Sequence, residues 1–455
     1  MIKKIKFYND SILGNLELDF TKPDGNPYNT IIIAGENGTG KTSIFNKLAE
    51  FLSSGSFEPF ENIIYTDKNN NDCKMLRSKT VGDNIEGEPF LIEQTKKKAI
   101  YKAVNEDNII KNNDADIRNY GCIYSRAKTG FHAERITSVT TEQLDQSNVD
   151  IDSSDDYTSI KQLLIDIDTI DNSLWRNISR NPANKVTIKQ FDKSCGLSRF
   201  KNAFNNFFDT IKFDYIDNEN KQEKNIFFLK NKKKISIDNL SSGEKQIIFR
   251  GTQLLKNNNV INNGIILIDE PELSLHPKWQ LKILNYYRNL FSIPKGKQTA
   301  QIIIATHSNF IIKSAVTDPN VLILVISENS KNKTCTKVVP SSFVLNPTTS
   351  DEINYEAFGI DSAEYHIQLY GKLQNDNSLT EIKATDTFIQ SHPKYDSSKY
   401  EKINDFTNPR NGHVTRYFTL PSFVRNSIDH PSPTNTYTPE ELHKSIVFLR
   451  DLLTP

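Results

Sequence analysis

Gly35-Glu36-Asn37-Gly38-Thr39-Gly40-Lys41-Thr42-Ser43 is the stretch that decides the fold of this chain. It follows an apolar run at 30–34, as expected of a buried strand, and it precedes a helical pattern at 44–49. A strand, a glycine-rich loop and Gly-Lys-Thr at a helix start are the context of a phosphate-binding loop. The glycines let backbone N–H groups turn toward phosphate oxygens, and the helix N-terminus adds the positive end of its dipole. The stretch therefore predicts a nucleoside triphosphate site.

The polar side chains of this loop have separate expected tasks. Lys41 would neutralise the β- and γ-phosphates, and the Thr42 hydroxyl would hold Mg²⁺. The other loop residues expected to contact the nucleotide are Asn37, Gly38, Gly40 and Ser43. A chance glycine-rich turn is the alternative, and the flanking strand and helix patterns argue against it.

The bulk composition bounds the class of protein. A chain of 455 residues is long enough for about two to four domains. Its 56 basic and 56 acidic residues give zero formal net charge, so a whole-surface attraction to nucleic acid or anionic lipid is not indicated. The cysteines lack zinc or redox spacing, no apolar run approaches about 18 residues, and the N-terminus lacks the apolar core of a signal peptide. We expect a cytoplasmic protein that is not inserted in a membrane.

A second group of motifs begins near residue 235. Residues 235–246 read as a short strand, a serine- and glycine-rich turn, and the start of a helix. Backbone N–H groups and hydroxyls at a helix start form an anion site. The same residues also make an ordinary helix cap with its capping glutamate, so this segment taken alone leaves both readings open.

Two apolar strands that follow end in chemically active side chains. The run at 265–268 reads as a buried parallel strand and leads into Asp269 and Glu270. Asp269 can orient the Mg²⁺ held by the loop threonine, and Glu270 is placed to polarise a water for attack on the γ-phosphate. The strand at 301–306 ends in His307, which at an equivalent strand end can sense the γ-phosphate. We predict catalytic roles for Glu270 and His307.

In this order, the segments resemble the motifs of the ATP-binding-cassette (ABC) ATPases. Walker A corresponds to 35–42, the signature motif to 240–244, Walker B to 265–270, the D-loop to 272–277 and the switch histidine to 307. The resemblance implies an α/β fold, an ABC-type P-loop NTPase head, and ATP and Mg²⁺ as cofactors, with Thr42 and Asp269 at the metal. It also implies that signature residues of one subunit contact the ATP of another. These residues are Ser241, Ser242, Gly243 and Glu244, with Ser242 where glycine is commoner and Glu244 where glutamine is commoner.

Two further stretches resemble the soluble branch of this superfamily. They are Asp-Glu-Pro-Glu-Leu-Ser-Leu-His-Pro at 269–277 and Ala-Thr-His-Ser at 305–308. That branch includes the RecF, Rad50 and overcoming-lysogenisation-defect ATPases and the ATPase subunits of bacterial anti-phage systems such as Septu and PARIS. The resemblance implies a sensor and scaffold that forms homodimers or higher oligomers on ATP and controls a separate nuclease or toxin. A RecF-like DNA-repair ATPase is an alternative, so nucleic acid or a phage component is a candidate trigger.

The rest of the chain divides by composition. We predict a head formed by 1–52 and 235–346, a large, mostly helical inserted lobe at 53–234, and a mainly helical C-terminal extension at 347–455 that serves as an effector or partner-binding module. Helices are expected at 157–178 and 197–211. The Q-loop glutamine is not assigned, because Gln143, Gln146 and the loop after the strand-like 120–124 are all candidates.

The C-terminal extension carries one chemical pattern. Arg425-Asn426-x-x-x-His430 is similar to the motif of the HEPN ribonucleases. Arg425 could hold a phosphate, and His430 could move a proton to or from a ribose oxygen. An ATPase-gated RNase that uses its own tail is therefore an alternative function. The competing explanation is a structural helix end closed by Pro431, followed by a helix at 439–453.

Overall fold

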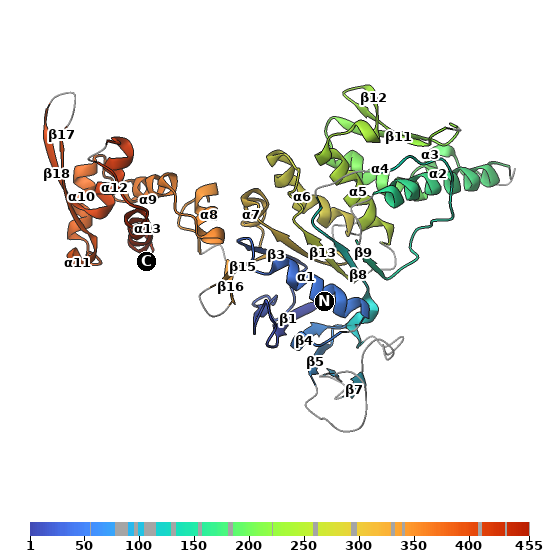
Figure 1. Cartoon of the computed structure of the whole chain (residues 1–455), viewed down its shortest axis with the longest axis horizontal. Helices are drawn as coiled ribbons and strands as arrows, with labels where there is room; N and C mark the ends of the chain where they lie inside the picture. The colour runs from blue at the N-terminus through green and yellow to red at the C-terminus, as the bar shows by residue number, and fades with distance from the viewer. Residues whose placement is uncertain are drawn as a thin grey trace. The chain divides into compact units, whose positions relative to one another are not determined.

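The computed structural model divides into two compact units, Met1–Lys337 (unit 1) and Val338–Pro455 (unit 2), which are described separately (Figure 1). The residues that the structure describes are 1–54, 56–77, 90–94, 99–103, 115–128, 133–152, 157–180, 185–220, 222–257, 263–292, 298–328, 333–338, 342–407, 412–432 and 435–454.

A seven-stranded sheet forms the centre of unit 1, in the order β16-β15-β3-β14-β13-β8-β9. The strands are β3 (Thr30–Gly35), β8 (Cys122–Ser125), β9 (Val149–Ile151), β13 (Ile265–Asp269), β14 (Gln301–Thr306), β15 (Val321–Glu328) and β16 (Lys333–Val338). The pairings from β15 through to β9 are parallel. Every residue of β3, β13 and β14 is buried, which explains their continuous apolar sequence. Because the strands are parallel, the predicted functional side chains meet at one edge of the sheet.

Part of the range predicted as an inserted lobe lies in this central sheet. β8 pairs with β13 so that Cys122 lies opposite Ile265 and Ser125 opposite Ile268. The loop that starts at Arg126 therefore leaves the sheet next to the strand that ends in Asp269. Of the Q-loop candidates, this loop is the one adjacent to that strand, whereas Gln143 and Gln146 lie in irregular structure before β9.

Unit 1 also contains a six-stranded antiparallel sheet, in the order β2-β1-β4-β5-β6-β7. Its strands are β1 (Ile2–Phe7), β2 (Glu17–Asp19), β4 (Phe60–Thr66), β5 (Asp72–Arg77), β6 (Phe90–Gln94) and β7 (Ala99–Ala103). Helix α1 (Lys41–Ser54) follows the phosphate-binding loop, and its residues Phe45 and Phe51 are buried in one core cluster with residues of both sheets. This core fixes the direction in which the loop enters the helix.

The rest of unit 1 combines helices with a small sheet. Its elements are η2 (Ile117–Tyr120), α2 (Thr158–Ser179), α3 (Ile188–Phe191), α4 (Gly196–Phe207), β10 (Ile211–Asp217), β11 (Asn225–Lys230), β12 (Lys233–Ser236), η3 (Ile237–Asn239), α5 (Ser242–Lys256), α6 (Pro277–Leu290) and α7 (Asn309–Ala315). Helix α2 matches the expected 157–178. Helix α4 ends at Phe207, before the expected 211, because Phe208 is already extended and Ile211 opens β10. Phe200, Phe204 and Phe207 of α4 are buried.

Unit 2 is mainly helical and has its own hydrophobic core. Its elements are α8 (Ser350–Phe358), α9 (Ala363–Asp376), α10 (Ile382–Ser391), α11 (Ser397–Tyr400), the hairpin of β17 (Glu401–Thr407) and β18 (Val414–Thr419), α12 (Leu420–Asp429) and α13 (Pro439–Leu453). The fully buried Asp386 carboxylate accepts hydrogen bonds from the backbone N–H groups of Phe418 and Thr419, which ties α10 to the start of α12. In the described parts of both units, no helix has the length and apolar character needed to cross a membrane.

Candidate nucleotide site

The predicted loop residues line a cavity of about 300 Å³ at the edge of the central sheet. Its lining consists of Ile12, Asn37, Gly38, Gly40, Lys41, Thr42, Ser43, Glu270 and His307. The structure therefore brings together all six loop residues predicted to contact nucleotide and both predicted catalytic side chains. They come from three separate strand ends, those of β3, β13 and β14.

Glycine is required in the loop for both conformation and space. Gly38 and Gly40 have φ angles of +83° and +96°, in the region that favours glycine. A Cβ atom on Gly40 would also lie 2.6 Å from the Cδ2 atom of Leu13, so a larger residue would displace that side chain. The backbone can thus turn its N–H groups inward, as phosphate binding requires.

Lys41 lies folded against its own loop. Its Nζ donates hydrogen bonds to the carbonyl oxygens of Gly35 and Glu36, both at 2.8 Å. Burial lowers the pKa of Lys41 to about 8, and the nearby carboxylates of Glu270 and Asp269 oppose this shift. An ammonium that is held by neutral carbonyls and the Thr39 hydroxyl can exchange them for phosphate oxygens, which are stronger partners.

Thr42 and Asp269 form a direct contact between the loop and β13. The Thr42 hydroxyl donates to Asp269 Oδ2 at 2.8 Å. Burial raises the pKa of Asp269, and its other oxygen, Oδ1, is buried without a hydrogen-bond partner among the described residues. A hydroxyl beside a buried carboxylate with a free oxygen is the donor set that Mg²⁺ prefers, so these residues fit the predicted metal.

Glu270 and His307 lie against each other at the cavity. His307 Nε2 is 3.2 Å from Glu270 Oε1. Glu270 has a φ of +42°, which is uncommon for a residue with a side chain, and its N–H donates to the Ala305 carbonyl at 2.9 Å. Backbone strain of this kind persists where the surrounding structure holds it, and it concentrates at functional sites. Burial lowers the pKa of His307, so its imidazole is neutral at pH 7.

Two contributors to the site were not predicted as functional residues. Glu272 Oε1 accepts hydrogen bonds from the Thr306 hydroxyl at 2.8 Å and from the His307 N–H at 2.6 Å, so it fixes the segment that carries His307. Lys333 donates to the Gly38 carbonyl at 3.1 Å and places a second cation at the loop. The Asp-Glu-Pro-Glu pattern was a signal for Glu272, whereas an isolated lysine on β16 gives no sequence signal.

The signature residues form a self-contained helix cap. Ser241 caps α5, where its hydroxyl accepts from the Glu244 N–H, while Glu244 Oε2 accepts from the Ser241 N–H at 2.9 Å. Glu244 Oε1 accepts from Lys230 at 2.6 Å, so both carboxylate oxygens already have protein partners. None of Ser241, Ser242, Gly243 and Glu244 lines the loop cavity of the same chain.

The two predicted RNase residues occupy the end of α12 in unit 2. His430 stacks on Phe406 with ring centroids 4.6 Å apart and lines a cavity of about 550 Å³ that Asp429 also lines. Arg425 forms an ion pair with Asp429, one turn further along the helix, and is not among the cavity residues. Asp429 therefore lies next to both predicted residues, but its carboxylate already forms an ion pair with Arg425.

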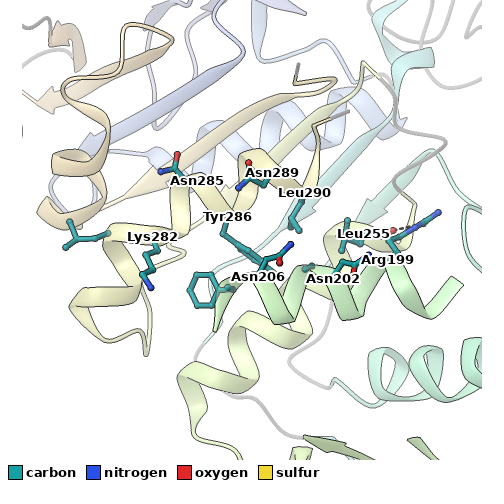
Figure 2. Close-up of a pocket in the computed structure, with 12 residues that line it drawn as sticks. Arg199, Asn202, Asn206, Leu255, Lys282, Asn285, Tyr286, Asn289 and Leu290 are labelled. Carbon is teal, nitrogen blue, oxygen red and sulfur yellow. Dashed lines mark hydrogen bonds between the residues drawn. The ribbon is translucent and has the colours of Figure 1, made fainter. Parts of the chain in front are cut away.

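A larger cavity in unit 1, about 550 Å³, lies elsewhere and shares no residue with the loop cavity. Figure 2 shows its walls, which are the faces of α4 and α6 with the end of α5. Asn202 and Asn206 come from α4, and Asn285 and Asn289 come from α6. It contains none of the predicted site residues.

The fold and the loop cavity together define a P-loop ATPase of the α/β class. The sequence model of the family described as "AAA domain, putative AbiEii toxin, Type IV TA system" matches residues 31–313, which is more than half of the chain. The chain belongs to this family, and it is an ATPase. The predicted relationship and fold class are thereby confirmed.

Curated relatives and solved structures extend this comparison. The chain is 24% identical over 403 residues to the Septu protein PtuA of Bacillus thuringiensis, covering 84% of this chain and 90% of that protein. It is 22% identical over 416 residues to a Septu protein PtuA of Bacillus mycoides, covering 88% of this chain and 51% of that one. The retron Vc95 probable ATPase of Vibrio cholerae is 34% identical over 99 residues, 20% of this chain and 18% of its own length. The SMC head domain of Thermotoga maritima matches with a TM-score of 0.37 at 13% identity, covering 74% of this chain and 98% of the domain.

Proposed function

We propose that this chain is the ATPase sensor and scaffold of an anti-phage defence system, in which ATP-dependent association of two copies controls a separate nuclease or toxin. The observation that carries the proposal is the loop cavity, which gathers phosphate-binding and hydrolytic side chains but no signature residue. Because this cavity lacks the signature residues 241–244, a second copy of the chain must supply them. The similarity to the Septu protein PtuA over most of both chains supports the defence context.

In this proposal, each side chain of the cavity has a separate role in hydrolysis. Lys41 leaves the loop carbonyls and neutralises the β- and γ-phosphates. Thr42 and Asp269 hold Mg²⁺, which supplies charge neutralisation at the phosphate oxygens when it is bound. Glu270 accepts the proton of the attacking water, and His307, which is neutral and 3.2 Å from Glu270, contacts the γ-phosphate.

The signature helix completes the site from a second copy. Its N-terminus presents N–H groups and the positive end of the helix dipole, with the Ser241 and Ser242 hydroxyls beside them. Both oxygens of the Glu244 carboxylate accept hydrogen bonds, one from Ser241 and one from Lys230. Glu244 therefore stabilises the N-terminus of the helix and is not a direct phosphate ligand in this proposal. ATP between two copies then joins them, and hydrolysis separates them.

The first test is Glu270→Gln. The amide cannot accept a proton, so we expect hydrolysis to fall by about 10²- to 10⁴-fold while ATP binding remains. Multi-angle light scattering should then show dimers in ATP, whereas the Lys41→Ala control should stay monomeric because it lacks the phosphate cation. A Glu270→Gln protein that hydrolyses ATP at the wild-type rate would remove Glu270 from the catalytic role. A slow but monomeric variant would instead refute dimerisation alone.

The tail provides a second candidate function, an RNase gated by the ATPase. The observation that favours it is the cavity lined by Asp429 and His430. The geometry supports the first function better, because Arg425 is neutralised by Asp429 and is not placed at this cavity. The RecF-like alternative rests on sequence resemblance, and salt-sensitive binding of duplex DNA would favour it.

A further inference from the structure

The sheet β10-β11-β12 has one covered face and one open face. Phe213, Ile216, Ile226 and Phe228 are buried on the covered side. Tyr215 and Leu229 lie on the open side and are 39% and 38% exposed. These two side chains therefore lie at the surface and are not part of the core.

The strand register arranges the open face in rows, two of which carry its large exposed side chains. Lys212, Leu229 and Lys234 lie side by side across the three strands. Tyr215, Phe227 and Ser236 form the neighbouring row. Residues 227 and 229 are two apart on β11, so the rows are separated by about 7 Å. Neither of these two rows contains a carboxylate; the next row pairs Asp217 with Asn225 at the far end of the strands.

The rings of Tyr215 and Phe227 form a stacked pair, and a lysine ammonium lies over both rings. The rings of Tyr215 and Phe227 have centroids 5.3 Å apart and planes inclined by 27°. The Lys234 ammonium lies 4.3 Å and 4.2 Å from the two centroids. A lysine held by ring faces in this way can be displaced by a planar group that stacks on the same faces.

Further lysines gather where β11 turns into β12. Asn231 and Lys232 both have positive φ angles, which makes the turn tight. Lys232 and Lys233 are exposed, and within the described part of the chain neither has an ion-pair partner. Lys233 lies opposite Lys230 in the strand register and shares its side of the sheet, where Glu244 neutralises Lys230. Lys234 on the open face, with Lys232 and Lys233 at the adjoining turn, thus places positive charge beside the exposed aromatic rings.

We propose that this face binds single-stranded nucleic acid. Bases stack on Tyr215 and Phe227, and phosphates contact Lys232, Lys233 and the displaced Lys234. Stacking of this kind requires bases that are not paired, so single strands fit the face and duplexes do not. The chain carries no net charge, and the attraction is therefore local to this patch.

The sheet lies next to the signature helix in the chain, and this place indicates how nucleic acid binding acts on the ATPase. This consequence rests on the proposed function. β12 is followed by η3 and then by Ser241, and Lys230 on β11 holds Glu244 of the signature cap at 2.6 Å. A ligand that orders this sheet also orders the signature helix that a second copy needs. Nucleic acid binding itself is independent of ATP and of dimerisation.

The test measures fluorescence anisotropy of labelled oligo(dT) and oligo(U) with the purified chain in the absence of ATP. The two probes distinguish DNA from RNA as the source of the ligand. Tyr215→Leu/Phe227→Leu keeps apolar side chains but removes the rings, and we expect affinity to fall about 10-fold or more. Lys232→Ala/Lys233→Ala should weaken binding and lower the slope of log Kd against log salt by about 1.4. Lys189→Ala/Lys193→Ala, which removes the same charge from exposed positions elsewhere in unit 1, should bind as the wild type does.

Each other outcome overturns the proposal. Absence of saturable binding to both probes refutes it, as does unchanged affinity in the leucine variant. Competition by duplex DNA at equal affinity would show general electrostatic attraction instead. A leucine variant that loses self-association or binding to another protein, but not to the oligonucleotides, would make this face a protein contact. Basal ATP hydrolysis without nucleic acid, measured on every variant, confirms folding and keeps this test separate from that of the ATPase.

Discussion

Lys41 is the residue at which burial and charge oppose each other most directly. Its ammonium lies in a buried position, held by two carbonyl oxygens, and burial lowers its pKa to about 8. The carboxylates of Asp269 and Glu270 keep the shift from being larger. The loop therefore holds a cation that is charged at pH 7 but close to losing its proton, and phosphate binding stabilises the charged form.

This position gives a pH dependence of nucleotide binding. Below pH 8, Lys41 is already protonated in the free protein, so affinity should be flat. Above pH 8, binding must first return a proton to the lysine, and the Kd should rise by about 10-fold per pH unit. Titration of a fluorescent ATP analogue between pH 7 and 9.5 measures this. In Lys41→Arg the guanidinium stays charged, so its Kd should not change across this range. A wild-type Kd that is equally flat would show that Lys41 does not bind phosphate as a cation.

The motif spacing located the loop residues and the carboxylates, because their chemistry is contiguous in sequence. It could not locate Lys333, which comes from the edge strand β16 and reaches the Gly38 carbonyl only through the fold. Glu272 lay inside a recognised motif, but its two hydrogen bonds to Thr306 and His307 depend on β13 and β14 being neighbours. Contacts between strand ends that are distant in the chain could not be predicted from the sequence.

At the scale of elements, the start of α5 packs closely against the segment after β13. A Cβ atom on Gly243 would lie 2.5 Å from the Ser274 carbonyl oxygen, which is backbone and cannot rotate away. Ser274 itself has a φ of +60°, so this segment has little freedom to adjust. Gly243 is therefore required for packing, independently of any contact with ATP.

Gly243→Ala should destabilise the nucleotide-free protein. Overpacking of this kind costs about 1–3 kcal/mol, which corresponds to a fall in Tm of a few °C. Thermal unfolding measures it, with Gly371→Ala on α9 as a matched helical control because a Cβ atom there would meet nothing within 4 Å. The control should be unchanged or slightly more stable, since alanine favours helix over glycine. Equal melting curves for the two variants would show that the segment at Ser274 moves aside without cost.

Elements with a strong periodic pattern were predictable, and short irregular strands were not. α13 was expected at 439–453 and occurs at Pro439–Leu453, since its apolar spacing is regular and Thr438 and Pro439 mark its start. β8 was expected as a strand-like segment at 120–124 but was not assigned to the central sheet, and β9, with three residues, carries too little pattern to be predicted. Their place became clear only from pairing with β13.

At the scale of the whole molecule, the two units have separate cores and separate polar networks. Unit 1 holds the entire loop cavity, and unit 2 holds the tail cavity with His430. In unit 2, Arg450 of α13 forms an ion pair with Glu356 and lies over the Tyr355 ring, so helix α8 is attached to the last helix by its own contacts. Unit 2 is thus a folded module, and its task can be tested apart from that of the ATPase.

The sensor proposal predicts that unit 2 leaves RNA intact. Arg425 is neutralised by Asp429, and His430 is stacked on Phe406, so neither is arranged to hold a phosphate beside a ribose. Total RNA incubated with the full chain, ATP and Mg²⁺ should remain uncut while ATP is hydrolysed. The Arg425→Ala/His430→Ala variant should behave in the same way.

Cleavage by the wild type that is lost in the Arg425→Ala/His430→Ala variant would establish the RNase instead. Lys41→Ala then decides whether the ATPase gates it, because this variant lacks the phosphate cation but keeps unit 2 unchanged. RNA cleavage by the wild type and not by Lys41→Ala would show that nucleotide binding in unit 1 gates the RNase. If the full chain hydrolyses ATP and no RNA is cut, the result agrees with the proposal that a separate nuclease or toxin is the effector and contradicts the RNase alternative.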